Sequence, residues 1–260
     1  MKIKRAFLFK VYTLFAVLTL AGCVKPTSYP ELTAEPYPSS LVLPAQQRVG
    51  GRSVENRLVI YLVLGQGPDT TFILSTIHGD ESTGTPLVQK LAEYLQQNPD
   101  LLRGRKAVLL PVANPDGMAR NSHFNANGID LNRNFAAANR LNNKESGPVA
   151  LSEPEARTIN RIIQQYNPDR IVSIHQPLAC IDYDGPGVNL AIQMALYCDL
   201  PIKRLGAKSG SLGSYAGVNL GIPIITFEMF ETDSKLDSEA LWKKYEKSLI
   251  AAIVYPEPVK

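Results

Sequence analysis

The chain has 260 residues, of which 45% are hydrophobic and 20% charged, so it is long and apolar enough to bury the core of one α/β domain. This composition excludes a disordered or fibrous chain. The formal net charge is +3, but residues 1–22 contain four bases and no acids, which leaves a net charge of −1 on the remainder. Bulk charge therefore indicates no basic face, and we expect no nucleic-acid partner.

The N-terminal segment has the features of a secretory signal peptide. Its bases precede an apolar run at 11–22, which is shorter than the roughly 20 residues of a membrane-spanning helix. The run ends in Leu20-Ala21-Gly22-Cys23, which resembles a bacterial lipobox and implies lipidation of Cys23 after removal of residues 1–22. Val24, in place of Asp, resembles the outer-membrane sorting pattern. We expect an outer-membrane lipoprotein that faces the periplasm and is held to the membrane through Cys23; the alternative is an ordinary signal peptide or short anchor with an incidental cysteine.

A tether and one domain are expected after the signal peptide. Residues 23–47 contain five prolines among Ser and Thr, a composition that stays extended, so the folded domain is expected at 48–260. We found no repeat or second linker within 57–255. Cys180 and Cys198 could form one disulfide or could both be small buried thiols, and their spacing does not decide between these alternatives.

The elements of this domain alternate between strands and helices. Apolar runs bounded by turn residues predict strands, whereas a 3.6-residue apolar period and a Ser152/Glu155 capping box around Pro154 predict helices. In chain order the predicted elements are strands at 57–64 and 71–77, a helix at 86–97, a strand at 106–112, a helix at 153–166, a strand at 170–174, a helix at 189–198, a strand at 223–227 and a helix at 238–254. This alternation predicts an α/β fold with a mostly parallel or mixed central sheet and helices on both faces.

Three of the predicted strands are followed by side chains that can bind a metal or transfer protons. His78 and Glu81 follow the second strand, His175 follows the strand at 170–174, and Glu228 follows the strand at 223–227. Two histidines and one glutamate around an open position form a known catalytic zinc set, and a carboxylate directly after an apolar strand is costly unless it is paired, metal-bound or catalytic. The alternative for each residue taken singly is a structural side chain, but two of the three histidines in the chain occupy such positions.

Other catalytic motifs are missing from the sequence. It contains no H-E-x-x-H helix, no G-x-S-x-G elbow, no G-x-x-x-x-G-K-[ST] loop and no paired C-x-x-C.

Over about residues 57–255 the sequence resembles the zinc carboxypeptidases of the M14 family. The resemblance lies in an ordered series of motifs: His78-x-x-Glu81, Asn114-Pro-Asp-Gly117, Gly128-Ile-Asp-Leu-Asn-Arg-Asn-Phe135, His175 and Thr226-Phe-Glu228. The resemblance implies one Zn²⁺ per chain, held by His78, Glu81 and His175, with Glu228 as general base and acid. It also implies that two residues of the long motif, Asn132 and Arg133, hold the free carboxylate of a peptide substrate. A surface arginine or a structural ion pair is the alternative for Arg133.

Two further segments, 152–155 and Pro177-Leu-Ala-Cys-Ile181, look most like the murein peptide amidase branch of that family. This resemblance implies hydrolysis of the γ-D-glutamyl–diaminopimelate bond of murein peptides. The second charged centre of diaminopimelate needs an acidic partner, for which Asp182 is the candidate; a solvated loop carboxylate beside Asp184 is the alternative. The rival functions are a general periplasmic carboxypeptidase on L-peptides, a zinc deacylase of the aspartoacylase type, and a weakly catalytic lipoprotein that binds murein peptides.

One position departs from the family pattern. The family usually has an Arg five residues before the Gly of the long motif, where it stabilises the oxyanion, and His123 stands there in this chain. Either Arg120 reaches the site instead, or His123 supplies a weaker, pH-dependent donor.

Overall fold

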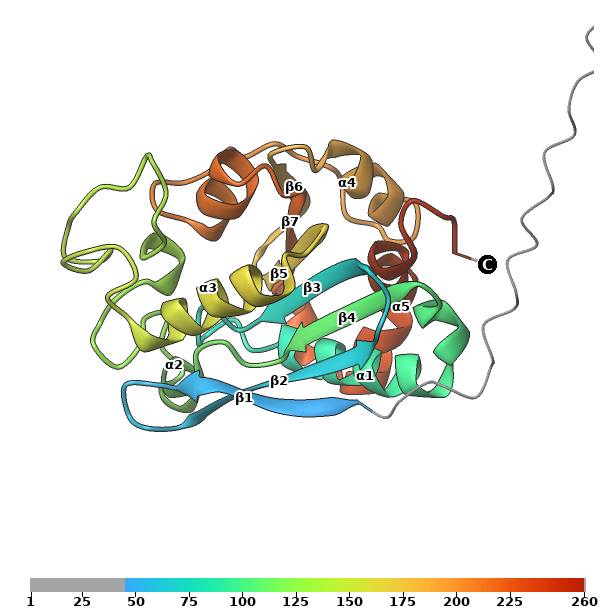
Figure 1. Ribbon diagram of the computed structural model, residues 1–260, viewed down its shortest axis with the longest axis horizontal. Helices are drawn as coiled ribbons and strands as arrows, with labels where there is room; N and C mark the ends of the chain where they lie inside the picture. Colours follow the sequence, from blue (N-terminus) through green and yellow to red (C-terminus); the bar gives the residue numbers. More distant parts are fainter. Residues whose placement is uncertain (1–44, 260) are drawn as a thin grey trace, which may run out of the picture. The chain divides into compact units, whose positions relative to one another are not determined.

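The computed structural model describes residues 45–259 (Figure 1). The predicted signal peptide, Cys23 and the tether up to residue 44 lie outside the described residues. The first strand begins at Gln46, close to the predicted start of the domain.

A seven-stranded mixed sheet forms the centre of the domain, in the order β1-β2-β4-β3-β5-β7-β6. Four central strands are parallel, and antiparallel neighbours flank them: β1 and β2 on one side and β6 on the other. The strands are β1 (Gln46–Arg52), β2 (Leu58–Gly65), β3 (Asp69–Ser75), β4 (Arg105–Leu110), β5 (Arg170–His175), β6 (Leu178–Asp184) and β7 (Ile224–Phe230). The expected α/β domain with a mixed sheet is confirmed.

Helices cover both faces of the sheet, as Figure 1 shows. The longer helices are α1 (Gly84–Gln97), α3 (Pro154–Tyr166), α4 (Val188–Ala195) and α5 (Ser238–Val254); shorter ones are α2 (Pro115–Arg120), η1 (Pro99–Leu102), η2 (Leu131–Arg133), the π-helical η3 (Gly213–Asn219) and η4 (Glu231–Lys235). One hydrophobic core lies between the sheet and α1, α4 and α5, and a second lies between the sheet and α3. The central strands are buried on both faces, which explains their uninterrupted apolar runs.

Two strands, β1 and β6, were not predicted from the sequence. β1 has the sequence QQRVGGR, with almost no apolar residues, and it forms because it pairs with β2 at the edge of the sheet. β6 has the sequence LACIDYD, in which Asp182 and Asp184 interrupt the apolar pattern, and it pairs with β7. The same pairing carries β7 on to Phe230, so Glu228 lies inside this strand and does not follow its end.

The predicted capping box of α3 is wrong. The N-cap is Glu153 and makes no side-chain capping hydrogen bond. Glu155 is instead fully buried, and its carboxylate accepts hydrogen bonds from the backbone N–H of Val54 and the side chain of Asn125. Glu155 therefore makes hydrogen bonds to distant segments of the chain and does not cap the helix.

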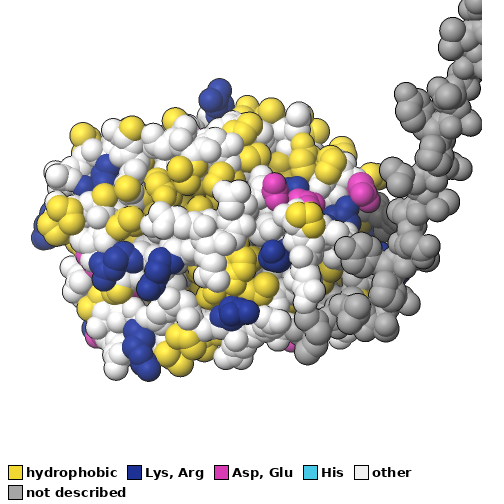
Figure 2. Space-filling view, viewed as in Figure 1, with side chains coloured by type: hydrophobic (Ala, Val, Ile, Leu, Met, Phe, Trp, Pro, Cys, Tyr) yellow, Lys and Arg dark blue, Asp and Glu magenta, His cyan; other side chains and the backbone are white. Residues whose placement is uncertain are grey.

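Of the two alternatives for the cysteines, the structure shows free thiols: Cys180, within β6, and Cys198, after α4, form no disulfide. Among residues 45–259, no helix has the length and apolar character needed to cross a membrane. On the face shown in Figure 2, Lys and Arg side chains are spread among hydrophobic and neutral polar ones.

Candidate active site

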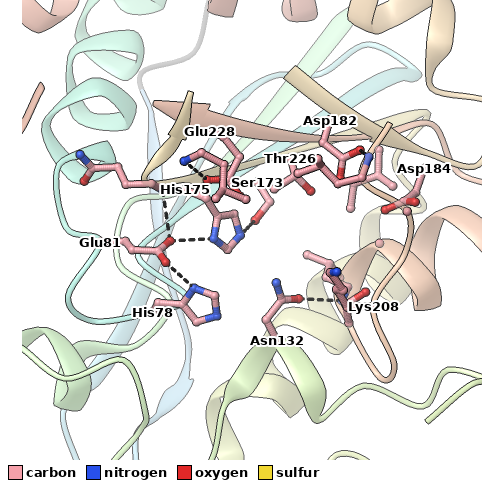
Figure 3. Close-up of a pocket in the computed structure, with 18 of the residues that line it drawn as sticks. His78, Glu81, Asn132, Ser173, His175, Asp182, Asp184, Lys208, Thr226 and Glu228 are labelled. Carbon is pink, nitrogen blue, oxygen red and sulfur yellow. Dashed lines mark hydrogen bonds and ion pairs between the residues drawn. The ribbon is translucent and has the colours of Figure 1, made fainter. Parts of the chain in front are cut away.

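A cavity opens where the carboxyl ends of the parallel strands meet, and the predicted metal ligands converge at one end of it (Figure 3). His175 is the last residue of β5, and His78 and Glu81 lie in the turn after β3. The Nδ1 atom of His78 lies 2.9 Å from one carboxylate oxygen of Glu81, and Nδ1 of His175 lies 2.8 Å from the other. Both imidazoles thus direct the same ring nitrogen at one carboxylate.

The opposite nitrogen of each imidazole is also held. Nε2 of His78 lies 3.2 Å from the carboxylate of Asp130, and Nε2 of His175 lies 3.0 Å from the hydroxyl of Ser173. Metal-binding histidines usually have such a partner on the far nitrogen, which fixes the ring and its tautomer. Two fixed imidazoles on either side of one carboxylate are the residue types of a catalytic zinc donor set.

The electrostatics of this cluster follow from its contacts. Burial lowers the pKa of His78, but hydrogen bonds to Asp130 and Glu81 outweigh it and raise the pKa to about 9. Burial likewise opposes ionisation of Glu81, yet the hydrogen bonds of His175 and His78 hold its pKa well below the ordinary range. The carboxylates of Glu81 and Asp130 therefore stabilise a positive charge beside them.

Glu228 lies in the middle of β7, in register with His175 on the neighbouring β5. Its side chain is buried and lines the cavity, and its carboxylate accepts a hydrogen bond from the backbone N–H of Leu178 at 3.3 Å. Burial raises the pKa of Glu228. A carboxylate with a raised pKa beside a metal site can exchange a proton near neutral pH.

Asn132 and Arg133 line the cavity from η2. The side-chain oxygen of Asn132 accepts a hydrogen bond from the N–H of Leu212 at 2.8 Å, and Figure 3 shows its amide nitrogen turned toward the cavity. The guanidinium of Arg133 donates to the carbonyl of Asn132 at 2.7 Å and lies 3.8 Å from the carboxylate of Asp130. The pair thus presents donors suited to a substrate carboxylate.

The structure separates the two candidates for the oxyanion donor. Arg120 forms an ion pair with Glu55 at the exposed end of α2 and does not line the cavity. His123 stacks on His78, with ring centroids 3.8 Å apart, and its Nδ1 lies 3.4 Å from the carboxylate of Asp80. Nitrogen or oxygen atoms of His78, Glu81 and His123 come within 4.8 Å of one another. His123 is therefore the candidate that lies beside His78, although it is not among the residues that line the cavity, and its role stays a prediction.

Asp182 lines the cavity as expected, but it already has a partner: its carboxylate accepts a hydrogen bond from the N–H of Leu205 at 2.8 Å. Asp184 and Lys208 also line the cavity, and neither was predicted to do so. The spacing of Asp182 and Asp184 on one strand would have placed both on the same face, had β6 been predicted.

The comparisons with known proteins agree with this site. A family model described as zinc carboxypeptidase matches residues 43–183. Murein peptide amidase A of Escherichia coli (strain K12) is 35% identical over 189 residues, covering 66% of this chain and 75% of that protein. Mouse carboxypeptidase M is 31% identical over 125 residues, covering 39% of this chain and 28% of that protein.

Solved structures share the fold. The murein-tripeptide amidase of Escherichia coli O157 superposes with a TM-score of 0.60 at 27% identity, covering 84% of this chain and 95% of that chain. The carboxypeptidase A of Helicoverpa armigera superposes with a TM-score of 0.67 at 23% identity, covering 82% of this chain and 69% of that chain. The chain is a hydrolase and belongs to the M14 family of zinc carboxypeptidases.

Proposed function

We propose that this protein binds one zinc ion and hydrolyses a C-terminal amide bond in peptides, most specifically the γ-D-glutamyl–diaminopimelate bond of murein peptides. The observation on which this proposal rests is one cavity that joins three metal-type ligands, His78, Glu81 and His175, to a buried carboxylate, Glu228, and a carboxylate-binding guanidinium, Arg133. The residues proposed to bind the metal, to transfer protons and to bind the substrate carboxylate therefore line one cavity.

Substrate orientation follows from the donors at η2. The free C-terminal carboxylate of the substrate would bind the guanidinium of Arg133 and the amide nitrogen of Asn132, since both residues line the cavity and the Asn132 amide nitrogen is turned toward it. Because Asn132 is itself held by the N–H of Leu212, its amide keeps a fixed orientation before the substrate arrives. The scissile bond then lies toward Glu228 and the histidines.

The proton transfers belong to Glu228. When bound at His78, Glu81 and His175, zinc supplies a Lewis acid that lowers the pKa of water and polarises the scissile carbonyl. Glu228 accepts the proton of the attacking water and donates it to the leaving amine, for which its burial and raised pKa suit it. The backbone N–H of Leu178 holds one oxygen of this carboxylate in place.

The murein bond is supported by the 35% identity to murein peptide amidase A, over three quarters of that protein. The test compares the purified protein on the tripeptide L-alanyl-γ-D-glutamyl-diaminopimelate and on a blocked L-dipeptide with a free C-terminus. Release of diaminopimelate with little hydrolysis of the dipeptide is the expected result. The opposite preference would make the protein a general metallocarboxypeptidase, and binding of the tripeptide without hydrolysis of either peptide would make it a peptide-binding protein.

We further propose that Cys23 carries a lipid and anchors the domain at the outer membrane, facing the periplasm. This proposal rests on the Leu20-Ala21-Gly22-Cys23 pattern and on Val24. A Cys23→Ser variant is expected to lose acyl labelling and membrane fractionation in intact cells. Labelling and fractionation equal to those of the unmodified chain would contradict the assignment.

A further inference from the structure

A buried carboxylate without a partner lies at the end of the cavity away from the histidines. Asp184, the last residue of β6, is only 7% exposed, and among residues 45–259 no side-chain hydrogen bond or ion pair to it is formed. A buried ionised carboxylate without a partner costs several kcal/mol. Burial and the neighbouring Asp182 raise the pKa of Asp184 to about 6, and the charge of Arg204 offsets this only in part.

Two glycines of η3 make room for this carboxylate. A Cβ atom added at Gly213 would lie 2.1 Å from an Asp184 carboxylate oxygen, and one at Gly217 would lie 2.7 Å from the Asp184 Cβ. Any larger residue at these two positions would have to displace the aspartate. The Asp184 side chain thus packs directly against the two glycines of η3, and Asp184 also lines the cavity.

A cation lines the same end of the cavity. Lys208 is exposed, and within the described part of the chain its ammonium group forms no hydrogen bond or ion pair. Figure 3 shows Lys208 and Asp184 on the side of the cavity opposite His78 and Glu81. Within the described residues Lys208 and Asp184 form no ion pair with each other, and both line the cavity, where a ligand can reach them.

We propose that Asp184 and Lys208 together bind a second amino-acid head group, the carboxylate of which faces Lys208 and the ammonium group of which faces Asp184. Such a group would terminate the side chain of the residue that is released, while its first carboxylate binds Arg133. This inference rests on the proposed function and assigns the substrate class within it: peptides whose C-terminal residue carries a distal zwitterion, as diaminopimelate does. Asp182 has a structural role here, since its carboxylate is bound to the N–H of Leu205.

The test uses four matched tripeptides that differ only in the C-terminal residue. Diaminopimelate has both distal charges, lysine has only the ammonium, 2-aminopimelate has only the carboxylate, and norleucine has neither. The full chain and its Asp184→Asn and Lys208→Gln variants are assayed for kcat/KM on all four, and calorimetry measures binding of the four free amino acids. Asp199→Asn and Lys203→Gln make the same charge changes on exposed residues that do not line the cavity.

We expect Asp184→Asn to lower kcat/KM and affinity about 10- to 100-fold for ligands with the distal ammonium and to leave the other two unchanged, because a charged hydrogen bond is lost. Lys208→Gln should act in the same way on the two ligands with the distal carboxylate only. The two control variants should match the unmodified chain. Equal losses on all four ligands, or none, would overturn the proposal.

Calorimetry separates this inference from the proposed function. If the protein hydrolyses no γ-D-glutamyl bond but still ranks the four amino acids as described, the proposed substrate bond is wrong and the zwitterion site stands. If the murein tripeptide is hydrolysed but the four amino acids bind equally in the unmodified chain and in both variants, the hydrolase stands and the zwitterion site is wrong.

Discussion

Replacing Asp184 by Asn should stabilise the folded protein, and the size of the effect should depend on pH. The pKa of Asp184 is raised from its ordinary value of 3.8 to about 6 in the folded state, by burial and by Asp182, while Arg204 lowers it only in part. At about 1.4 kcal/mol per pH unit, this difference corresponds to an unfavourable contribution of at most about 3 kcal/mol once the group is ionised, because the carboxylate lines the cavity and water screens it in part. An amide of the same shape lacks this contribution.

The pH window follows from the two pKa values. Below about pH 3 the carboxyl group is protonated in the folded and in the unfolded chain, so it has little effect on the free energy of unfolding. Above about pH 7 it is ionised in both states, and the full cost of burying the charge is present. The stability gained by Asp184→Asn should therefore rise from about half a kcal/mol at pH 4 to at most about 3 kcal/mol at pH 8.

Urea unfolding of both proteins at pH 4 and pH 8, under the same metal conditions, measures this difference, because the contributions of groups that do not interact with Asp184 cancel. The charged neighbours, Asp182 on β6 and Arg204 and Lys208 on the adjoining loop, are the same in both proteins. An Asp199→Asn variant, in which the altered side chain is exposed, should show a difference near zero at both pH values. A gain that is the same at pH 4 and pH 8, or a loss of stability at pH 8, would refute the interpretation of Asp184 as a buried carboxylate without a partner.

Three further changes test the site and the core. Glu228→Gln should lower kcat by several orders of magnitude while zinc, measured by metal analysis, stays bound, because this side chain moves protons and is not a proposed metal ligand; loss of zinc from this variant would contradict its role. Chelation should abolish activity reversibly, and His78→Ala should lower the zinc content of the purified protein, whereas full zinc and activity in that variant would refute the ligand set. Asp233→Ala should lower the free energy of unfolding by about 3 kcal/mol, because it removes the buried carboxylate that binds Lys244 at 2.6 Å and the Tyr245 hydroxyl at 2.5 Å. Thermal unfolding measures this loss, and an unchanged Tm would contradict it.

Local sequence determined the parts of this protein that depend on short-range chemistry. The helix predicted at 238–254 has the same bounds as α5, and the apolar runs of the central strands identified β3, β4 and β5 to within about two residues at most ends, because burial on both faces requires such runs. Because parallel strands end at one edge of a sheet, the positions of His78 and His175 after two such strands were enough to predict that they meet.

Tertiary structure alone decided which polar side chains are free to act. Arg120 and His123 lie three residues apart in one polar stretch, yet one pairs with Glu55 on the surface and the other stacks on His78. Asp182 and Asp184 are similar in sequence, but only the fold brings Leu205 to the first and the glycines of η3 to the second. The physical reason is that a charged side chain is defined by the partner that satisfies it, and in these cases the partner comes from a distant segment of the chain.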